Sequence, residues 1–179
     1  MKKFLTSLLL LALTAGFAIS QDKAAATESV TASGLTFTFG KPWQKMKPAS
    51  SMRAGQLKYD NEGDLADVEA VFFHFGPNSG SVDANLQRWK GQFQGEVESK
   101  TEEKDHNGTK VTYFTATGTF MDGGFGQAKT AKDDWIMLAA IVPGTDGVVF
   151  IKFVGPKAAV EAAKADFEKL ASSPFAKAE

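Results

Sequence analysis

Three polar residues, Asn85, Arg88 and Gln92, have the types and spacing that best suit a binding site in this sequence. Separations of three and four positions place them on one stripe of a helix. On that stripe, Arg88 could donate a forked pair of hydrogen bonds to a carboxylate or a phosphate. A second interpretation stays open, in which the three side chains tie the helix to neighbouring loops by hydrogen bonds.

Residues suited to catalysis are few. The chain has no Cys and two His, which excludes thiolate metal sites and a Cys nucleophile and disfavours a His-rich metal centre. His74 lies near the end of an apolar strand, and we interpret it as a hydrogen-bonded structural residue. The glycines at 123, 124 and 126 lack the Lys-Ser/Thr of a phosphate-binding loop, which favours a flexible turn. We therefore expect no catalytic residues, no metal and no cofactor, and no enzymatic activity.

The charge balance limits the class of partner. Twenty Lys and Arg residues stand against 21 Asp and Glu residues, for a net charge of −1. A protein that binds nucleic acid through its phosphates is usually strongly basic. We therefore expect no nucleic-acid partner, and the partner is an unknown protein or a small ligand.

The N-terminus has the pattern of an export signal. Lys2 and Lys3 are followed by a short run of Leu and Ala, and Ala18 and Ser20 supply small residues for signal peptidase. We predict a signal peptide over residues 1–20, export to the periplasm or the extracellular space, and no stable membrane anchor after cleavage. Residues 21–33 lack apolar periodicity and are predicted to be a flexible leader. A single globular domain is expected over residues 34–175.

Hydrophobic patterns predict the elements that position these residues. Strict alternation indicates a strand over residues 35–39, and weaker alternation indicates another over 50–59. Residues 68–75 are apolar on both faces, which predicts a strand that is covered on both sides. Residues 81–93 fit a helix capped by Ser81, with an apolar stripe that includes Trp89 and with Gly95 as its end.

The second half is predicted to consist of hairpins and one helix. A charged strand over 96–104 and a Thr-rich strand over 110–120 flank an Asn-Gly turn. A flexible loop is expected to run from Met121 to Asp134, and two apolar strands, 135–142 and 148–154, form the next hairpin. The last helix begins at Pro156, with Val160, Ala163, Phe167 and Leu170 on its apolar face.

These elements predict an α+β fold. Tight hairpins require antiparallel pairing, and strands with two apolar faces require a covering layer on each side. We therefore expect an α/β/α sandwich with a mostly antiparallel sheet of about six to seven strands and two main helices.

Three segments resemble a known group. Residues 85–93 read N-x-x-R-W-x-x-Q-F, a helix motif of uncharacterised secreted bacterial proteins, and residues 72–76 and 150–156 are also similar to that group. The order of strands and helices resembles that of the PsbP/Mog1-like superfamily. The resemblance implies a domain that acts as a binding or accessory module, and it implies no catalytic residues.

Two functions are carried forward. The first is an exported, non-enzymatic binding or accessory module, for which Asn85, Arg88 and Gln92 are the candidate binding residues. The second is a small-ligand or lipid carrier, which needs an internal apolar pocket between sheet and helix. A connected apolar cavity of several hundred Å³ would favour the carrier, whereas a closed core would favour the binding module.

Overall fold

The computed structural model describes residues 27–123 and 128–177. The predicted signal peptide, the start of the predicted leader and most of the glycine-containing segment 123–126 lie outside the described residues. The predicted long loop before residue 135 is shorter than expected, because β7 extends to Asp122 and β8 begins at Thr130.

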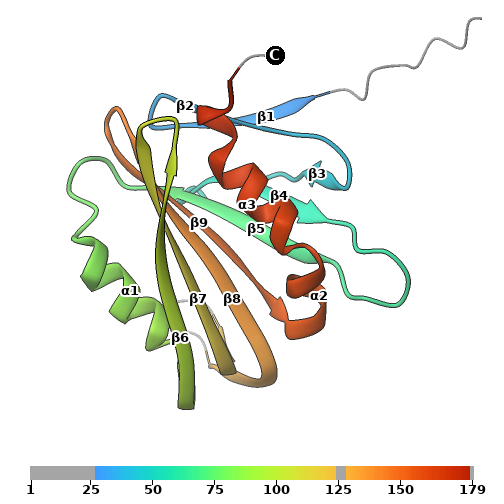
Figure 1. The fold of residues 1–179 in the computed structure, drawn as a ribbon. Helices are drawn as coiled ribbons and strands as arrows, with labels where there is room; N and C mark the ends of the chain where they lie inside the picture. The colour runs from blue at the N-terminus through green and yellow to red at the C-terminus, as the bar shows by residue number, and fades with distance from the viewer. Residues whose placement is uncertain (1–26, 124–127, 178–179) are drawn as a thin grey trace, which may run out of the picture.

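A seven-stranded antiparallel sheet forms the centre of the molecule (Figure 1). The strand order is β3-β4-β5-β9-β8-β7-β6. The strands are β3 (Trp43–Lys45), β4 (Arg53–Tyr59), β5 (Val68–His74), β6 (Phe93–His106), β7 (Thr109–Asp122), β8 (Thr130–Gly144) and β9 (Gly147–Pro156). The predicted α+β class and antiparallel sheet are confirmed.

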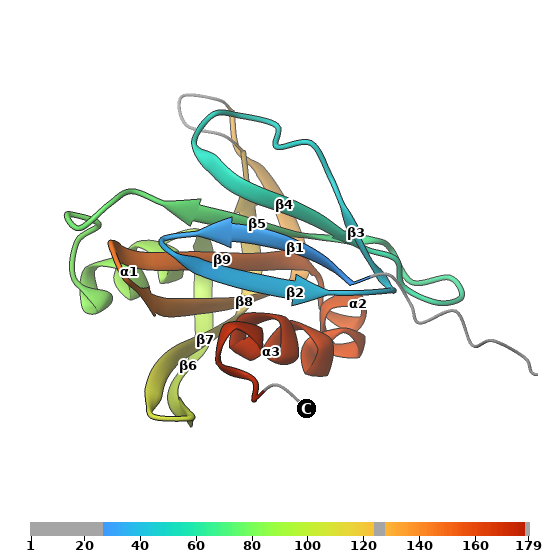
Figure 2. The same cartoon turned by 90° about the horizontal axis from the view of Figure 1, so that it is seen from above.

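Helices cover the sheet from both sides. Helix α1 (Val82–Lys90) lies on one side, and α2 (Lys157–Ala162) and α3 (Lys164–Ser172) lie on the other (Figures 1 and 2). A 3₁₀ turn, Ser173–Phe175, follows α3. We call the two sides of the sheet the α1 face and the α3 face.

The predicted leader is partly wrong, because its second half is a strand. Strand β1 (Glu28–Ala32) pairs with β2 (Leu35–Phe39) in a separate two-stranded sheet. The turn of this hairpin is held at Ser33, whose carbonyl accepts a hydrogen bond from the backbone N of Thr145 at 2.9 Å and whose Oγ donates to the carbonyl of Gly147 at 3.0 Å. The folded domain therefore extends before its predicted start at residue 34 and includes β1.

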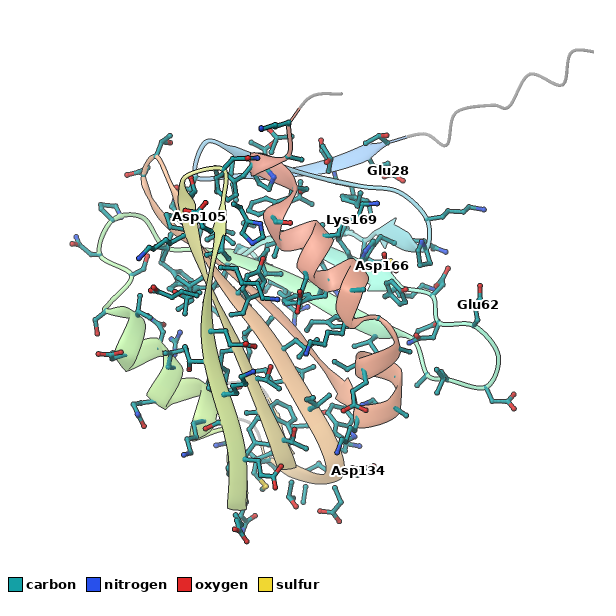
Figure 3. The ribbon with its side chains drawn as sticks, viewed as in Figure 1. Glu28, Glu62, Asp105, Asp134, Asp166 and Lys169 are labelled. Carbon is teal, nitrogen blue, oxygen red and sulfur yellow. The ribbon has the colours of Figure 1, made fainter. Side chains whose placement is uncertain are left out.

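The α3 face is a closed apolar core. Alternate residues of β4, β5, β8 and β9 point into it and meet α2, α3 and the β1–β2 hairpin. Phe153 is fully buried there and stacks on Phe167 of α3 with 5.6 Å between ring centroids. At the edge of this core the Tyr59 hydroxyl donates to Asp166 at 2.6 Å, and Asp166 lies on α3 in Figure 3.

The predicted last helix is bent into two. All four residues of its predicted apolar face are buried, but the helix breaks at Ala163, which separates α2 from α3. Ala163 is itself fully buried. The break therefore leaves two short helices that both pack on the α3 face, in place of one straight helix.

Helix α1 begins as predicted and ends earlier. Ser81 is its N-cap, and the Ser81 Oγ accepts a hydrogen bond from the backbone N of Ala84 at 3.2 Å. The helix ends at Lys90 with Gly91 as C-cap, so the predicted end at Gly95 is wrong. The cause is Phe93, which begins β6 and pairs with Phe120 of β7.

A tight turn joins β6 to β7 at one end of the sheet. At one end Asn107 and Gly108 join β6 to β7, and both have positive φ, as the predicted Asn-Gly turn requires. The backbone N of Gly108 donates to Asp105 at 3.0 Å. Figure 3 places Asp105 at this end of the sheet and Asp134 at the opposite end.

Candidate functional site

Helix α1 covers only part of its face of the sheet. Nine residues of helix span about 13 Å, which is shorter than the strands beneath it. The covered part is a second apolar cluster, in which Trp89 is 1% exposed and lies 5.8 Å from Phe150 between ring centroids. On the uncovered part, Val71 and Phe73 of β5 are only partly buried, and Phe75, just beyond β5, is 48% exposed. The prediction that both sides of β5 are covered is therefore wrong for this end of the strand.

The uncovered part forms a cleft of about 870 Å³. Strands β4, β5, β9, β8 and β7 all contribute to it, together with Gln92. An adjoining hollow of about 170 Å³ beside α1 shares Phe73, Gln92 and Lys152 with it. We call the two together the Lys152 cleft, and its lining is Arg53, Asp67, Val68, Glu69, Val71, Phe73, Phe75, Arg88, Trp89, Gln92, Phe120, Met121, Asp122, Gly123, Lys129, Trp135, Phe150, Lys152, Val154, Gly155 and Pro156.

Lys152 lies at the centre of this cleft. On β9 it is paired with Val71 on one side and Ala139 on the other, so its side chain leaves the middle of the sheet on the α1 face. Its Nζ donates to the Gln92 Oε1 at 2.6 Å. Among the described residues no carboxylate oxygen lies within 4.0 Å of this Nζ. Burial, and then the positive charge of Arg88, lower the pKa of Lys152 to about 8.

Arg88 is a second cation at the same site. Its side chain is exposed and lines the hollow beside α1. Its Nη2 donates to Asn85 Oδ1 at 2.5 Å, and within the described chain it has no carboxylate within 4.0 Å. Two positive groups without an acidic partner therefore meet beside an apolar surface.

Two of the three residues predicted from the helix stripe line the cleft, and the third does not. Arg88 and Gln92 line the cleft, although Gln92 follows the end of α1 and is not on the helix. Asn85 is 3% exposed, and its Nδ2 donates to the carbonyls of Ser79 and Ser81. Asn85 thus ties α1 to the preceding loop and orients Arg88 through its Oδ1.

Sequence reasoning missed Lys152. The signal was present, because Lys152 is the one charged residue in the apolar run from Val148 to Val154. A charge in a central strand is costly unless it is paired or reaches water. Whether Lys152 is paired or reaches water depends on how far α1 extends over β9. The sequence pattern of the strand does not contain that information.

Two of the three acidic residues of the cleft, Asp67 and Glu69, are already engaged. Asp67 lies 3.3 Å from the Lys58 Nζ. Glu69 lies 3.8 Å from Arg53 and accepts a hydrogen bond from the Gln56 Nε2 at 2.9 Å. The third acidic residue, Asp122, is exposed at the end of β7, and the cation Lys129 is exposed just before β8. Together they add one charge of each sign to the cleft.

One end of the cleft is apolar. Phe120 and Trp135 stack there with 5.7 Å between centroids and 4° between planes. Trp135 is paired with Pro156 across β8 and β9, and Val154 lies between Pro156 and Lys152 along the strand. The cleft therefore joins a positive centre to an aromatic end.

Both histidines have structural partners. The His74 Nδ1 is 3.1 Å from the carbonyl oxygen of Val148, as the structural interpretation predicted, and its Nε2 is 4.0 Å from Asp146. The His106 Nε2 is 3.0 Å from the Tyr113 hydroxyl. Residues 27–123 and 128–177 contain no group of three or more His, Asp or Glu residues placed to hold a metal ion.

A second hollow, of about 720 Å³, lies beside the loop that follows β4. Its Asp60 is already engaged, because Asp60 lies 2.6 Å from the Lys58 Nζ and also accepts from the Gln44 amide, and its one cation, Lys41, is exposed. Pro42, at one side of this hollow, follows a cis peptide bond. The Lys152 cleft is the stronger candidate site, because its cation Lys152 is partly buried and has no acidic partner among the described residues.

For the described segments, no helix has both the length and the apolar character needed to cross a bilayer.

Comparison with known proteins finds similarity in structure but not in sequence. No protein-family model matches the sequence, and no curated protein sequence matches it significantly. The chain is similar to the solution structure of cyanobacterial PsbP (CyanoP) from Synechocystis sp. PCC 6803, with 15% identity, a TM-score of 0.52, and coverage of 88% of this chain and 96% of that one. At this identity the similarity concerns the fold alone. The predicted resemblance is confirmed at that level: this chain has a PsbP-like fold.

Proposed function

We propose that the protein is an exported binding module that catalyses no reaction and holds its partner in the Lys152 cleft. The observation that supports this most is the pair Lys152 and Arg88, two cations without an acidic partner in the described chain, placed beside an open apolar surface. A partly buried charge without a counter-charge destabilises a fold. A partner that supplies an acidic group would relieve that cost.

Export is part of the proposal and rests on the sequence. Lys2, Lys3, the apolar run and the small residues at 18 and 20 predict cleavage after Ser20. The mature protein is expected to begin at Gln21 or within a few residues of it. Intact-mass measurement of the exported protein tests this, and a mass that still includes residues 1–20 would contradict it.

A second candidate function uses the same cleft. A small-ligand or lipid carrier is favoured by the volume of about 870 Å³ and by the aromatic end at Trp135, since small-ligand sites commonly measure roughly 300–1,000 Å³. The expected pocket of such a carrier lay between sheet and helix, whereas this hollow lies on the open part of the α1 face. The core on the α3 face is filled by buried side chains.

A charge reversal at Arg88 tests the binding module. Arg88→Glu should abolish capture of a partner from the native exported fraction while the melting temperature stays within about 2 °C, because Arg88 is exposed. Lys90→Glu is the matched control, since Lys90 is an exposed cation on the same helix and does not line the cleft.

Three results would contradict parts of the proposal. Equal capture by the Arg88 and Lys90 variants would remove the cleft as the binding surface. Unfolding of the Arg88 variant would make Arg88 a structural residue. If no partner is captured above background, the proposal of a macromolecular partner is wrong, and the small-ligand or lipid carrier becomes the better candidate function.

A further inference from the structure

Two cationic side chains, Lys152 and Arg88, line the same hollow of the Lys152 cleft. The Lys152 ammonium has three N–H groups, and one of them is used by the Gln92 Oε1. Arg88 uses an N–H of Nη2 for Asn85 and lines the same hollow, and its guanidinium carries further N–H donors. An anion seated between the two would therefore accept from a lysine and an arginine together.

Apolar surface begins directly beside these donors. Phe73 and Phe75 stack with 6.0 Å between centroids on the α1 side of Lys152. On the other side, Val154 leads along β9 to the Phe120–Trp135 stack. A ligand that satisfied only the two cations would leave this surface in contact with water, so the complementary ligand also carries an apolar body.

From this juxtaposition we infer that the Lys152 cleft binds a carboxylate with an unbranched acyl body, with the carboxylate between Lys152 and Arg88 and the acyl chain lying over Val154 toward Trp135. This assignment rests on the proposed function of the cleft and names the chemistry of its occupant.

The charge count favours a monoanion. Two cations of the cleft are partly buried, Lys152 and Arg53, and Arg53 already faces Glu69 at 3.8 Å, whereas Arg88 and Lys129 are exposed. A carboxylate neutralises one buried charge, and its two oxygens match two donors. A doubly charged phosphate would bring an excess negative charge onto a surface that also holds Glu69, Asp67 and Asp122.

The length of the apolar part sets the size of the ligand. Four residue steps along β9 separate Lys152 from Pro156, which is roughly 13 Å of strand. A saturated chain of about ten carbons has that length, so decanoate is a suitable probe.

Titration calorimetry with decanoate tests the assignment. Wild-type protein should bind decanoate, while decyltrimethylammonium, which has the same chain and the opposite charge, should bind at least about tenfold more weakly. Lys152→Met should weaken decanoate binding about tenfold to a hundredfold, as expected for loss of a charge-assisted hydrogen bond. Arg88→Gln should weaken it about three- to tenfold, because Arg88 is exposed to water.

Matched variants exclude a general loss of charge. Lys110→Met removes a lysine that is 73% exposed on β7, and Lys90→Gln removes an exposed cation of α1. Both should bind decanoate as the wild type does. A thermal melt of the Lys152 variant shows whether it is folded, and Lys152→Arg, which keeps the charge, should recover part of the affinity.

Several results would overturn the assignment. Equal binding of decanoate and decyltrimethylammonium, unchanged affinity of the folded Lys152 variant, or absence of decanoate binding would each exclude a carboxylate at Lys152. Tighter binding of decyl phosphate would replace the carboxylate by a phosphate. If these results occurred while Arg88→Glu still abolished partner capture, the proposed function would stand and only the ligand class would be wrong.

Discussion

The two faces of the seven-stranded sheet receive different amounts of cover from the helices. The α3 face packs against α2, α3 and the β1–β2 hairpin, and the large side chains that point into it, such as Phe37, Phe72 and Phe153, are fully buried. The α1 face has one helix of nine residues, and beyond that helix Val71, Phe73 and Trp135 are left partly exposed around Lys152. The first face contributes stability, and the second retains an apolar surface and an unpaired charge that folding alone does not need.

Adjacent residues of β9 point to the two faces and give the largest expected difference. Phe153 is fully buried against Trp43, Tyr59 and Phe167, so Phe153→Ala should lower the free energy of unfolding by about 3–5 kcal/mol. Val154 faces the cleft, and Val154→Ala should cost less than about 1 kcal/mol. Denaturant titration measures both, and equal midpoints would contradict the difference between the faces.

The covered part of the α1 face should behave like the α3 face. Trp89→Ala should cost about 3–5 kcal/mol, because Trp89 is 1% exposed and contacts Phe114 and Phe150. Lys157→Ala, at the partly exposed first residue of α2, should cost less than about 0.5 kcal/mol. A similar small loss for both variants in chemical denaturation would show that α1 does not hold its face together.

Lys152 should reduce stability, in contrast to the aromatic residues around it. At pH 7 Lys152→Met should raise the free energy of unfolding by about 1–2 kcal/mol, because relief of the buried charge exceeds the loss of one hydrogen bond to Gln92. The comparison by urea denaturation at pH 7 should show the variant as the more stable protein. A less stable variant would mean that the lysine has a structural role.

The pH dependence of that difference follows from the sign of the pKa shift. The pKa of Lys152 falls from 10.5 to about 8 on folding, so the cost of its charge is fully present below pH 8 and is relieved as the pH rises toward 10.5. The advantage of Lys152→Met should therefore shrink between pH 8 and 10. The pKa values of Tyr59 and Tyr113 are raised to about 12, and their contribution, lost above pH 10, is the same in both proteins and cancels.

Local sequence signals predicted the parts of the fold that depend on neighbouring residues. The Ser81 cap and the Asn107–Gly108 turn are examples, because a cap and a tight turn are set by a few adjacent side chains. Strand β1 was missed because its turn is held by residues more than a hundred positions away, at Thr145 and Gly147. Sequence patterns near Glu28 contain no trace of that contact.

The candidate site was only partly predictable for a related reason. Arg88 and Gln92 were identified from their spacing, whereas Lys152 and the open surface at Val71 and Phe73 were not. An apolar strand pattern shows that a side chain avoids water, but it does not show whether a helix of this chain or a bound partner provides the cover. The length of α1 decides that point, and α1 ended earlier than its pattern suggested.

The three tryptophans allow the most direct test of the claim that binding occurs on the open face. Trp135 lies in the cleft, Trp89 of α1 is buried at the edge of the cleft, and Trp43 is 5% exposed in the closed core. In an NMR titration with decanoate, the indole N–H signal of Trp135 should shift with saturation and that of Trp43 should stay in place. In Lys152→Met the midpoint of the Trp135 shift should move to a decanoate concentration about tenfold to a hundredfold higher. A shift of Trp43 as large as that of Trp135, or an unchanged Trp135 signal in the wild type, would contradict the account.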